Sequence, residues 1–381
     1  MANNNENKVL NVPLLRFPEF SGEWEMVSLQ DIATINPKSD PLQNTFIYID
    51  LEAVEKGELR KIQEIMREEA PSRAQRVIDN NDILFQCVRP YQKNNYIHRI
   101  LNTSNQQWVA STGYAQIRTT ELPNYIYHLL NTDEFNRKVM VRCTGSSYPA
   151  INSEDLATIH FYYTPDKKEQ LKISRLLDLL DKRIATQNKI IEDLKKLKSA
   201  IRKKMFSLLK DEYTESFEIN QLLDYEQPTA YIVANDEYST DTSLTPVLTA
   251  NKGFILGYTD EKFGIYQKGE CIIFDDFTMD AKYVSFPFKV KSSAIKILTA
   301  KPNVNLRFMF EYLSYWELKS EEHKRHYISE IASLVIELPS KERQSIIASL
   351  MTSLNSKLDI EAKTKIRYEE QKRYLLSQMF I

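Results

Sequence analysis

The sequence is poor in glycine, and this scarcity excludes several familiar nucleotide-binding sites. Only 8 of the 381 residues are glycine, about 2% against a usual ~7%. No G-x-G triplet occurs, so the dinucleotide-binding fingerprint and the Walker A loop are both absent. Three cysteines, Cys87, Cys143 and Cys271, lie far apart and form no C-x-x-C pair. Their spacing argues against a disulfide framework or a zinc site and favours buried, inert thiols.

Long apolar runs and an excess of one charge are also missing. No run approaches the ~18 apolar residues that span a bilayer. The first residues lack the charged and apolar blocks of a signal peptide. We therefore expect a cytoplasmic protein that does not associate with membranes. Lys and Arg number 50 against 52 Asp and Glu, a formal charge of −2, so any nucleic-acid-binding surface must be local.

The strongest positive signal is an internal repeat. Residues 165–206 align with residues 339–380 without a gap, at a constant shift of 174 positions. Both copies begin with proline and end with Met-Phe, which favours duplication over chance similarity. Identical residues occupy ten pairs of positions: Pro165/Pro339, Lys167/Lys341, Gln170/Gln344, Ile173/Ile347, Leu176/Leu350, Leu180/Leu354, Lys189/Lys363, Lys198/Lys372, Met205/Met379 and Phe206/Phe380.

Each copy predicts one long helix, since neither holds Gly or Pro after its first residue. Apolar residues recur at alternating steps of three and four, the spacing of a coiled-coil seam. We expect the two helices to pair along this seam, with Leu180 and Leu354 in one layer. The seam residues are Ile173, Leu177, Leu180, Ile184, Ile191, Leu194, Ile201 and Met205 in the first copy, and Ile347, Met351, Leu354, Leu358, Tyr368, Leu375 and Met379 in the second.

The segments between the helices have a different texture. Short apolar and aromatic runs alternate with Pro and Asn clusters, as in mixed α/β globules. The predicted fold class is therefore α+β, with two mixed α/β domains alternating with two helices that pair as an antiparallel coiled coil, in a pseudo-twofold repeat. The expected boundaries are an N-terminal segment 1–21, domain one 22–165, helix one 166–209, domain two 210–339 and helix two 340–381.

Several strings resemble one family over nearly the whole chain. They include PLLRFPEFSGEWEMVSLQDIATI (13–35), SSYPAINSEDLATIHFYYTPDKKEQLKISRLLDLLDKRI (146–184), PVLTANKGFILGYTDE (246–261), IIFDDFT (272–278) and FPFKVKSSAIKIL (286–298). Together with the order domain–helix–domain–helix, they resemble the DNA-specificity (S) subunit of type I restriction-modification enzymes. The second half departs from the pattern, because EHKRHYISEI (322–331) replaces the S-S-Y-P-A-I loop and Arg343-Gln344 replaces Glu169-Gln170.

The resemblance implies a non-catalytic subunit. Two target-recognition domains would each read half of a split, asymmetric sequence in double-stranded DNA. The paired helices would set the distance between half-sites and dock two methyltransferase (M) subunits, which restriction/translocase (R) subunits join. The chain itself would carry no cofactor, since S-adenosylmethionine belongs to the methyltransferase partner.

In the first domain, two polar strings are candidates for DNA contact. Reading base edges requires paired donors and acceptors, and residues 89–95 supply Arg, Gln, Asn and Tyr. Residues 144–148 supply hydroxyls just before a predicted strand. Ordinary polar surface loops are the alternative. The candidate residues are Arg89, Tyr91, Gln92, Lys93, Asn94, Ser146, Ser147 and Tyr148.

In the second domain the candidates are more scattered: Asn251, Lys252, Tyr258, Lys282, Lys289, Lys291, Lys324 and Arg325. Asp275-Asp276 could hold a metal ion, but neighbouring strand residues point to opposite faces, so turn capping or a contact to cytosine is favoured. His323-x-x-His326 has no nearby Cys, which argues against a metal site.

The first predicted helix is basic, and its role has several possible explanations. Residues 166–210 hold 14 Lys or Arg against 6 Asp or Glu, an excess of 8 positive charges. This face could contact phosphates, an acidic partner or only solvent. A coiled-coil scaffold with two protein-binding domains is the main alternative function. A stand-alone DNA-modifying enzyme is disfavoured, because no glycine-rich cofactor loop or N/D-P-P-Y/F string occurs.

Overall fold

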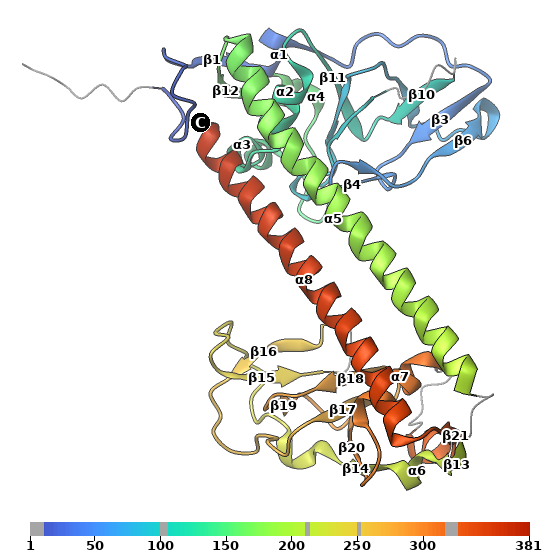
Figure 1. Ribbon diagram of the computed structural model, residues 1–381. Helices are drawn as coiled ribbons and strands as arrows, with labels where there is room; N and C mark the ends of the chain where they lie inside the picture. The colour runs from blue at the N-terminus through green and yellow to red at the C-terminus, as the bar shows by residue number, and fades with distance from the viewer. Residues whose placement is uncertain (1–10, 100–105, 210–213, 250–252, 317–326) are drawn as a thin grey trace, which may run out of the picture. The chain divides into compact units, whose positions relative to one another are not determined.

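The computed structural model describes residues 11–99, 106–209, 214–249, 253–316 and 327–381. The chain forms two compact units (Figure 1). The first unit contains residues 1–187 and 364–381, and the second contains residues 188–363. Each unit therefore includes part of the long helix 167–208 and part of the long helix 341–379.

The first unit is built on two four-stranded sheets. One has the order β6-β3-β10-β7, with β3 and β10 parallel, and the other has the order β2-β11-β8-β9. Their strands are β2 (Ala33–Ile35), β3 (Thr45–Ile49), β6 (Gln63–Met66), β7 (Ala74–Val77), β8 (Ile83–Gln86), β9 (Tyr96–Ile97), β10 (Gln107–Ser111) and β11 (Tyr114–Thr119). The remaining elements are β1 (Glu25–Ser28), which pairs with β12 (His160–Tyr163), the hairpin β4 (Val54–Glu55) and β5 (Glu58–Leu59), and helices α1 (Leu29–Ile32), α2 (Pro123–Leu130), α3 (Asp133–Arg142) and α4 (Ser153–Ala157).

The second unit repeats this plan. Its main sheet has the order β14-β20-β17-β18, a second sheet has the order β16-β15-β19 with β15 and β19 parallel, and β13 pairs with β21. The elements are β13 (Glu215–Glu218), α6 (Ile219–Leu222), β14 (Leu223–Glu226), β15 (Thr245–Leu248), β16 (Ile255–Thr259), β17 (Cys271–Asp275), β18 (Ala281–Val284), β19 (Lys289–Val290), β20 (Ile295–Ala300), α7 (Leu306–Tyr315) and β21 (Val335–Leu338). The mixed α/β content predicted for both segments is confirmed, and the sheet β2-β11-β8-β9 of the first unit has the same strand order as the sheet β14-β20-β17-β18 of the second.

Two long helices follow β12 and β21. Helix α5 spans Lys167–Leu208 and helix α8 spans Lys341–Met379. Each begins directly after a proline and a capping side chain. Asp166 Oδ1 accepts a hydrogen bond from the Lys168 amide at 2.7 Å, and Ser340 Oγ accepts one from the Arg343 amide at 3.3 Å. These caps satisfy amide groups that the first turn of a helix leaves without partners.

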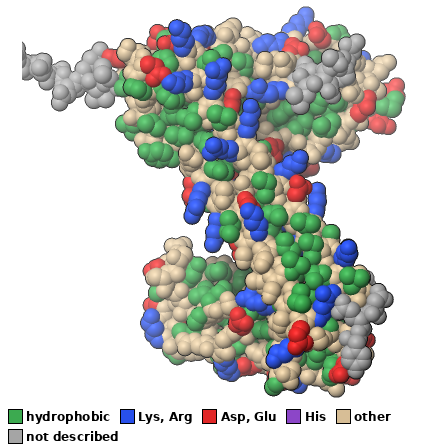
Figure 2. All heavy atoms as spheres, in the orientation of Figure 1, with side chains coloured by type: hydrophobic (Ala, Val, Ile, Leu, Met, Phe, Trp, Pro, Cys, Tyr) green, Lys and Arg blue, Asp and Glu red, His purple; other side chains and the backbone are tan. Residues whose placement is uncertain are grey.

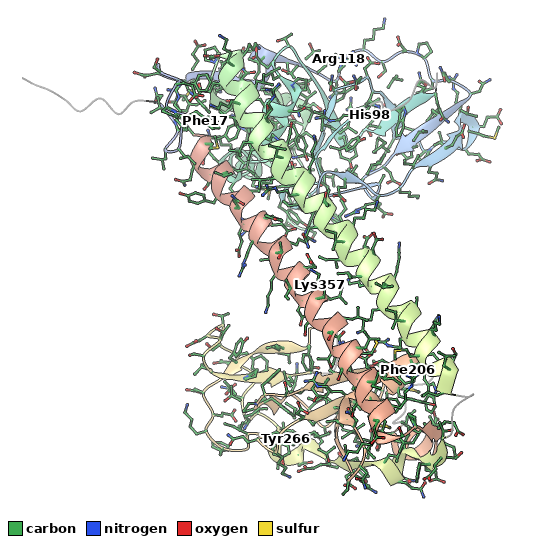
Figure 3. The ribbon with its side chains drawn as sticks, viewed as in Figure 1. Phe17, His98, Arg118, Phe206, Tyr266 and Lys357 are labelled. Carbon is green, nitrogen blue, oxygen red and sulfur yellow. The ribbon has the colours of Figure 1, made fainter. Side chains whose placement is uncertain are left out.

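The ends of the helices lie in different cores. The start of α5, through Ile173 and Leu177, packs in the core of the first unit, but its end places Phe206 in the core of the second (Figure 3). There Phe206 stacks on Tyr315 with ring centroids 5.1 Å apart. Helix α8 runs the opposite course: Ile347 lies in the second core and Phe380 in the first. The helix segments are therefore antiparallel within each unit.

The shared Met-Phe ending has a structural reason. Phe380 packs against Tyr125 at 5.4 Å and Trp24 at 6.1 Å between ring centroids. Phe206 meets Phe308 at 5.6 Å. Tyr125 and Phe308 are each the third residue of their helices, α2 and α7. Each phenylalanine thus fills the same position in a core built mainly from the other half of the sequence.

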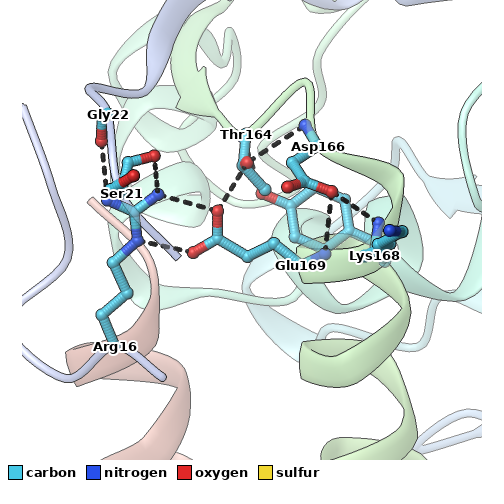
Figure 4. Close-up of polar contacts among 8 residues, drawn as sticks. Arg16, Ser21, Gly22, Thr164, Asp166, Lys168 and Glu169 are labelled. Atoms are coloured by element: carbon cyan, nitrogen blue, oxygen red, sulfur yellow. Dashed lines mark hydrogen bonds and ion pairs between the residues drawn. The ribbon is translucent and has the colours of Figure 1, made fainter. Parts of the chain in front are cut away.

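The Glu-Gln pair near the start of α5 ties the helix to its unit (Figure 4). Glu169 is fully buried and accepts hydrogen bonds from Arg16 at 2.7 and 2.9 Å and from the Thr164 hydroxyl at 2.7 Å. Gln170 accepts a hydrogen bond from the Leu122 amide, ahead of α2, and Gln344 does the same for Asn305, ahead of α7. The shared glutamine therefore binds the backbone amide that precedes the equivalent helix in each unit. The Arg16–Glu169 ion pair belongs to the first unit.

The seam positions are the buried or half-buried positions of both helices. In the first unit Ile173, Leu177 and Leu180 are buried, and in the second Ile347 and Met351 are buried. The remaining seam residues are intermediate in exposure, apart from buried Met379. The proposed Leu180/Leu354 layer is wrong, because Leu180 belongs to the first unit and Leu354 packs in the second. In an antiparallel arrangement, equal positions of two repeats lie toward opposite ends.

Two of the three cysteines are buried. Cys87 and Cys271 are buried, and burial raises the pKa of each thiol to about 12, so both are inert at neutral pH. Cys143 is intermediate in exposure. Within the described ranges, no helix has both the length and the apolar character that a membrane crossing requires.

Substitution of Leu180 by Asp tests the seam. Leu180 is 5% exposed, so an aspartate there buries a carboxylate and should cost several kcal/mol of unfolding free energy. Leu179 is 59% exposed and supplies the matched control, Leu179→Asp. Thermal unfolding measures both variants. Equal melting temperatures for L180D and the wild-type protein would refute the packing of this position.

Candidate nucleic-acid interface

Two polar loops that are far apart in the sequence meet in the first unit. The Arg89 amide donates a hydrogen bond to the Pro149 carbonyl at 2.7 Å, and Val88 forms a β-bridge with Ala150. The Arg89 guanidinium lies 4.4 Å from the centroid of the Tyr148 ring, within the range of a cation–π contact. The structure thus joins the two candidate strings, 89–95 and 144–148, into one surface.

The first loop holds a strained backbone. Arg89 and Lys93 have φ values of 54° and 52°, in the left-handed region, on either side of the 3-10 turn Pro90–Gln92. Non-glycine residues adopt this conformation at an energetic cost, and such residues concentrate at functional sites. Two contacts hold the turn: Asn136 Nδ2 donates to the Pro90 carbonyl at 3.1 Å, and Gln86 Nε2 donates to Gln92 Oε1 at 2.8 Å.

The second loop depends on a glycine. Gly145 has φ +90°, and a Cβ atom there would lie 3.0 Å from the Tyr148 carbonyl oxygen. A side chain at this position would therefore be strained both by conformation and by contact. The resulting turn exposes Ser146, Ser147 and Tyr148, and the Tyr148 side chain is 62% exposed.

The two loops border a cleft of about 740 Å³. Four of the predicted residues line it: Arg89, Gln92, Asn94 and Tyr148. The cleft is also lined by residues that the sequence analysis does not single out, namely Glu52, Glu55, Arg60 and Arg73, together with Leu51, Val54, Gln86 and Val88. Arginine, glutamine and asparagine are the side chains that form paired hydrogen bonds with base edges, and arginine also binds phosphate.

Some predicted residues hold the loop in place. Lys93 Nζ lies 2.5 Å from Asp133 and donates to the Asn131 carbonyl at 3.1 Å. Asn94 Oδ1 accepts a hydrogen bond from the Lys56 amide at 3.0 Å. Tyr91 is 51% exposed and is outside the set of residues that line the cleft. Arg89, Gln92 and Tyr148 are therefore the candidate residues best placed to meet a ligand in the cleft.

In the second unit, Lys289 is a structural residue. Its side chain is 1% exposed, and Nζ lies 2.5 Å from Glu261 and donates to the Phe263 carbonyl at 2.9 Å. The hydrogen bond from Lys289 lowers the pKa of the Glu261 carboxyl, which favours the ion pair. The prediction that Lys289 contacts DNA is wrong, because this cation is enclosed and already paired.

The other described candidates of the second unit lie on or after different strands. Lys282, on β18, lines a cavity of about 600 Å³ with Tyr283 and Arg307. Tyr258 lies on β16, and Lys291 is exposed after β19. The remaining candidates, Asn251, Lys252, Lys324 and Arg325, lie outside the described residues, as do His323 and His326.

The paired aspartates of the second unit are explained by local structure. Asp275 Oδ1 accepts hydrogen bonds from the amides of Phe277 and Thr278 at 2.8 and 2.9 Å, so it caps a turn. Asp276 accepts a hydrogen bond from the Tyr327 amide and lies 3.3 Å from buried Lys296. In the part of the chain that the structure describes, no group of three or more His, Cys, Asp or Glu side chains could hold a metal ion.

The basic character of α5 is partly neutralised within each unit. Lys167 and Lys172 pair with Glu121 and Glu19 in the first unit. In the second unit Arg202 pairs with Glu311 at 2.7 Å. Other Lys and Arg side chains of the helices remain at the surface, as Figure 2 shows. The remaining Lys and Arg side chains therefore give the helices a positively charged surface.

Comparison with known proteins identifies the same strings as a recurring domain. The family model described as "Type I restriction modification DNA specificity domain" matches residues 21–196 and again residues 212–370. Among curated proteins, the EcoR124I/EcoR124II specificity subunit of Escherichia coli is 39% identical over 178 residues, which cover 42% of this chain and 43% of that protein. The HindI specificity subunit of Haemophilus influenzae is 23% identical over 191 residues, 49% of this chain and 38% of that protein. The matched segments thus span less than half of either curated relative.

Solved structures share the fold. The S subunit of a type I restriction-modification system from M. genitalium has a TM-score of 0.65 at 15% identity, over 97% of this chain and 99% of that one. A chain from a study of complex assembly and conformational transition in the type I R-M system has a TM-score of 0.56 at 18% identity, over 93% and 97% of the two chains. Since the family model matches both halves, this chain belongs to the family of type I restriction-modification DNA specificity domains.

Proposed function

We propose that this chain is the DNA-specificity subunit of a type I restriction-modification complex and that it has no catalytic activity of its own. The observation that carries the proposal is the match of the specificity-domain family to both halves of the chain, 21–196 and 212–370. The curated relatives are specificity subunits of type I restriction enzymes. We infer that double-stranded DNA is the ligand.

The cleft of the first unit supports this ligand. Arg89 and Gln92 present donor and acceptor groups of the kind that distinguish bases in the major groove. Arg73, which also lines the cleft, supplies charge suited to the phosphate backbone, which positions a protein without reading sequence. Arg60 already pairs with Glu55 at 3.4 Å and with Glu58 at 2.8 Å. The strained turn Pro90–Gln92 holds Arg89 and Gln92 before the ligand arrives, so less entropy is lost on binding.

We further propose that the target has two different halves. One four-stranded sheet has the same strand order in both units, yet their loops differ, because the second unit lacks the S-S-Y-P-A-I string. Two such units in one chain would read an asymmetric, split sequence. The two helices would pair as an antiparallel coiled coil that relates the units by a pseudo-twofold axis. The 42 residues of α5 correspond to about 63 Å, or about 18 base pairs at 3.4 Å each.

Partner subunits would use the helices. Helix α5 exposes Ile190, Leu197 and Leu208 in the second unit. Their spacing of 7 and 11 residues places them on one face, which suits a protein partner better than solvent. We propose that two methyltransferase subunits dock on this region and bring S-adenosylmethionine, and that restriction/translocase subunits then join the complex in the cytoplasm.

Methylation mapping tests the proposal. The chain would be expressed with a cognate methyltransferase, and the host genome would be sequenced for modified adenines. The expected result is a single methylated motif of two unlike half-sites separated by a fixed spacer, which disappears when this chain is omitted. Methylation that is unaffected by its omission, together with DNA binding that does not depend on sequence or salt, would favour the coiled-coil scaffold instead.

Arg89→Ala tests the cleft directly. Removal of a base or phosphate contact should weaken DNA binding by about 1–3 kcal/mol, between about fivefold and a hundredfold in Kd, without a change in fold. Arg137, which is exposed on α3, provides the control R137A. Binding of the assembled complex to its target is measured at fixed salt. Unchanged affinity in R89A would exclude Arg89 from the site.

The repeat predicts the behaviour of half the chain. A fragment that ends near Leu209 retains Met205 and Phe206, which correspond to the Met379 and Phe380 side chains that complete its core. Such a fragment should associate with a second copy and recognise a symmetric repeat of one half-site. Analytical ultracentrifugation measures the association. A fragment that remains monomeric at every accessible concentration would contradict the prediction.

A further inference from the structure

Each unit holds one buried polar side chain at the same position of its equivalent helix. His128 is the sixth residue of α2, and Glu311 is the sixth residue of α7. Their exposures are 0% and 2%. His128 is an imidazole that contacts Asp178 near the start of α5. Glu311 is a carboxylate that contacts Arg202 near the end of α5. The two contacts therefore require different partners.

In the second unit, Glu311 requires positive charge. It accepts hydrogen bonds from Arg202 of α5 at 2.7 and 3.0 Å and from Asn355 Nδ2 of α8 at 3.2 Å. Lys198 Nζ lies 3.9 Å away. A buried carboxylate is strongly destabilising when its partner is removed, because the charge is left without compensation. The end of α5 thus supplies the positive charge of Arg202 and Lys198 to the buried Glu311 carboxylate.

In the first unit, the position that corresponds to Glu311 is His128, and this side chain requires no cation from the end of α8. His128 Nε2 lies 2.9 Å from Asp178 Oδ1 of α5, and burial lowers the pKa of His128, so the ring is neutral at neutral pH. The end of α8 contributes Lys372, which pairs with Asp181, and Leu376, which packs against the apolar core. The carboxylates here belong to α5 itself and not to α2.

The internal repeat shows where the two helix ends differ. At the constant shift of 174 residues, Lys198 corresponds to Lys372, and Arg202 corresponds to Leu376. Both ends therefore carry the same lysine, but one turn later α5 has arginine and α8 has leucine. Arginine at the place of Leu376 would put a guanidinium against an apolar core. Leucine at the place of Arg202 would leave Glu311 without its two-bond partner.

We propose that Arg202 with Glu311 in the second unit, and Leu376 with the apolar core of the first unit, form a pairing address that determines which helix end each unit accepts. The second unit accepts the α5 end of the first half of the sequence, and the first unit accepts the α8 end of the second half. Unlike halves therefore pair in preference to like halves, whether they come from one chain or from two copies. The self-association of the first half is opposed by Arg202 and is weaker than its association with the second half. The proposal is independent of DNA binding.

A full-length chain that is nicked after folding tests the address. A protease site placed at residues 210–213, between α5 and β13, leaves two halves that only non-covalent contacts hold together. After dilution and re-equilibration, native mass spectrometry separates like from unlike pairs by mass. The expected result is nearly complete pairing of unlike halves. A statistical mixture, in which half of all pairs are like pairs, would overturn the proposal.

Variants of the nicked chain identify the residues responsible. Arg202→Leu gives α5 the residue of α8, and it should raise the proportion of first-half pairs relative to unlike pairs about tenfold. Lys203, exposed one position further along α5, supplies the matched control K203L, which should leave the ratio unchanged. An R202L ratio equal to that of the wild-type chain would exclude the address.

A transplant covers the case in which R202L fails to fold. In the intact chain, L376R places an arginine in the first unit and should lower its melting temperature. H128E provides the matching carboxylate, and Asp178→Thr removes the carboxylate that would oppose it, since α8 carries Thr352 at the equivalent position. The triple variant H128E/D178T/L376R should therefore be more stable than D178T/L376R. A triple variant no more stable than D178T/L376R would overturn the proposal, because positions 128 and 376 would then not be coupled.

Discussion

The burial of the two helix ends is the contact on which the rest of the molecule depends. Phe206 completes the core of the second unit, and Phe380 completes the core of the first. A buried phenylalanine contributes about 1.5–3 kcal/mol through the hydrophobic effect alone, and the flanking Met205 and Met379 add to this. Without these residues, the α2 and α7 helices would each lose part of the apolar surface against which they pack. The sheets that support the candidate cleft rest on those same cores.

Local sequence patterns predict the parts of this structure that depend on near neighbours. The seam of α5 and α8, the prolines before them and the mixed α/β texture between them follow from spacing and composition. Contacts between distant residues could not be predicted in this way. Arg89 and Tyr148 are 59 residues apart in the sequence, and only the fold shows that they stack. Phe206 and Phe380 were visible as an identical pair, but the sequence contains no sign that each completes the core of the other half.

The errors have physical causes that can be stated. Lys289 looked like a surface cation, because charge does not reveal exposure, and the strand that carries it places it opposite Glu261. The expected Leu180/Leu354 layer follows from the identical positions of these leucines in the repeat. An antiparallel arrangement instead separates such positions. Arg60 and Arg73 were missed since each lies in an ordinary polar string, and only the folded sheet brings them to the cleft.

The continuity of α5 from one core into the other has a thermodynamic consequence. Unfolding of one unit would disturb the helix that carries Phe206 or Phe380 into the core of the other unit, so the two units are not expected to unfold independently. Heat or mutational damage on one side is thereby transmitted to the other. The stability of each unit therefore depends on residues supplied by the other half of the sequence.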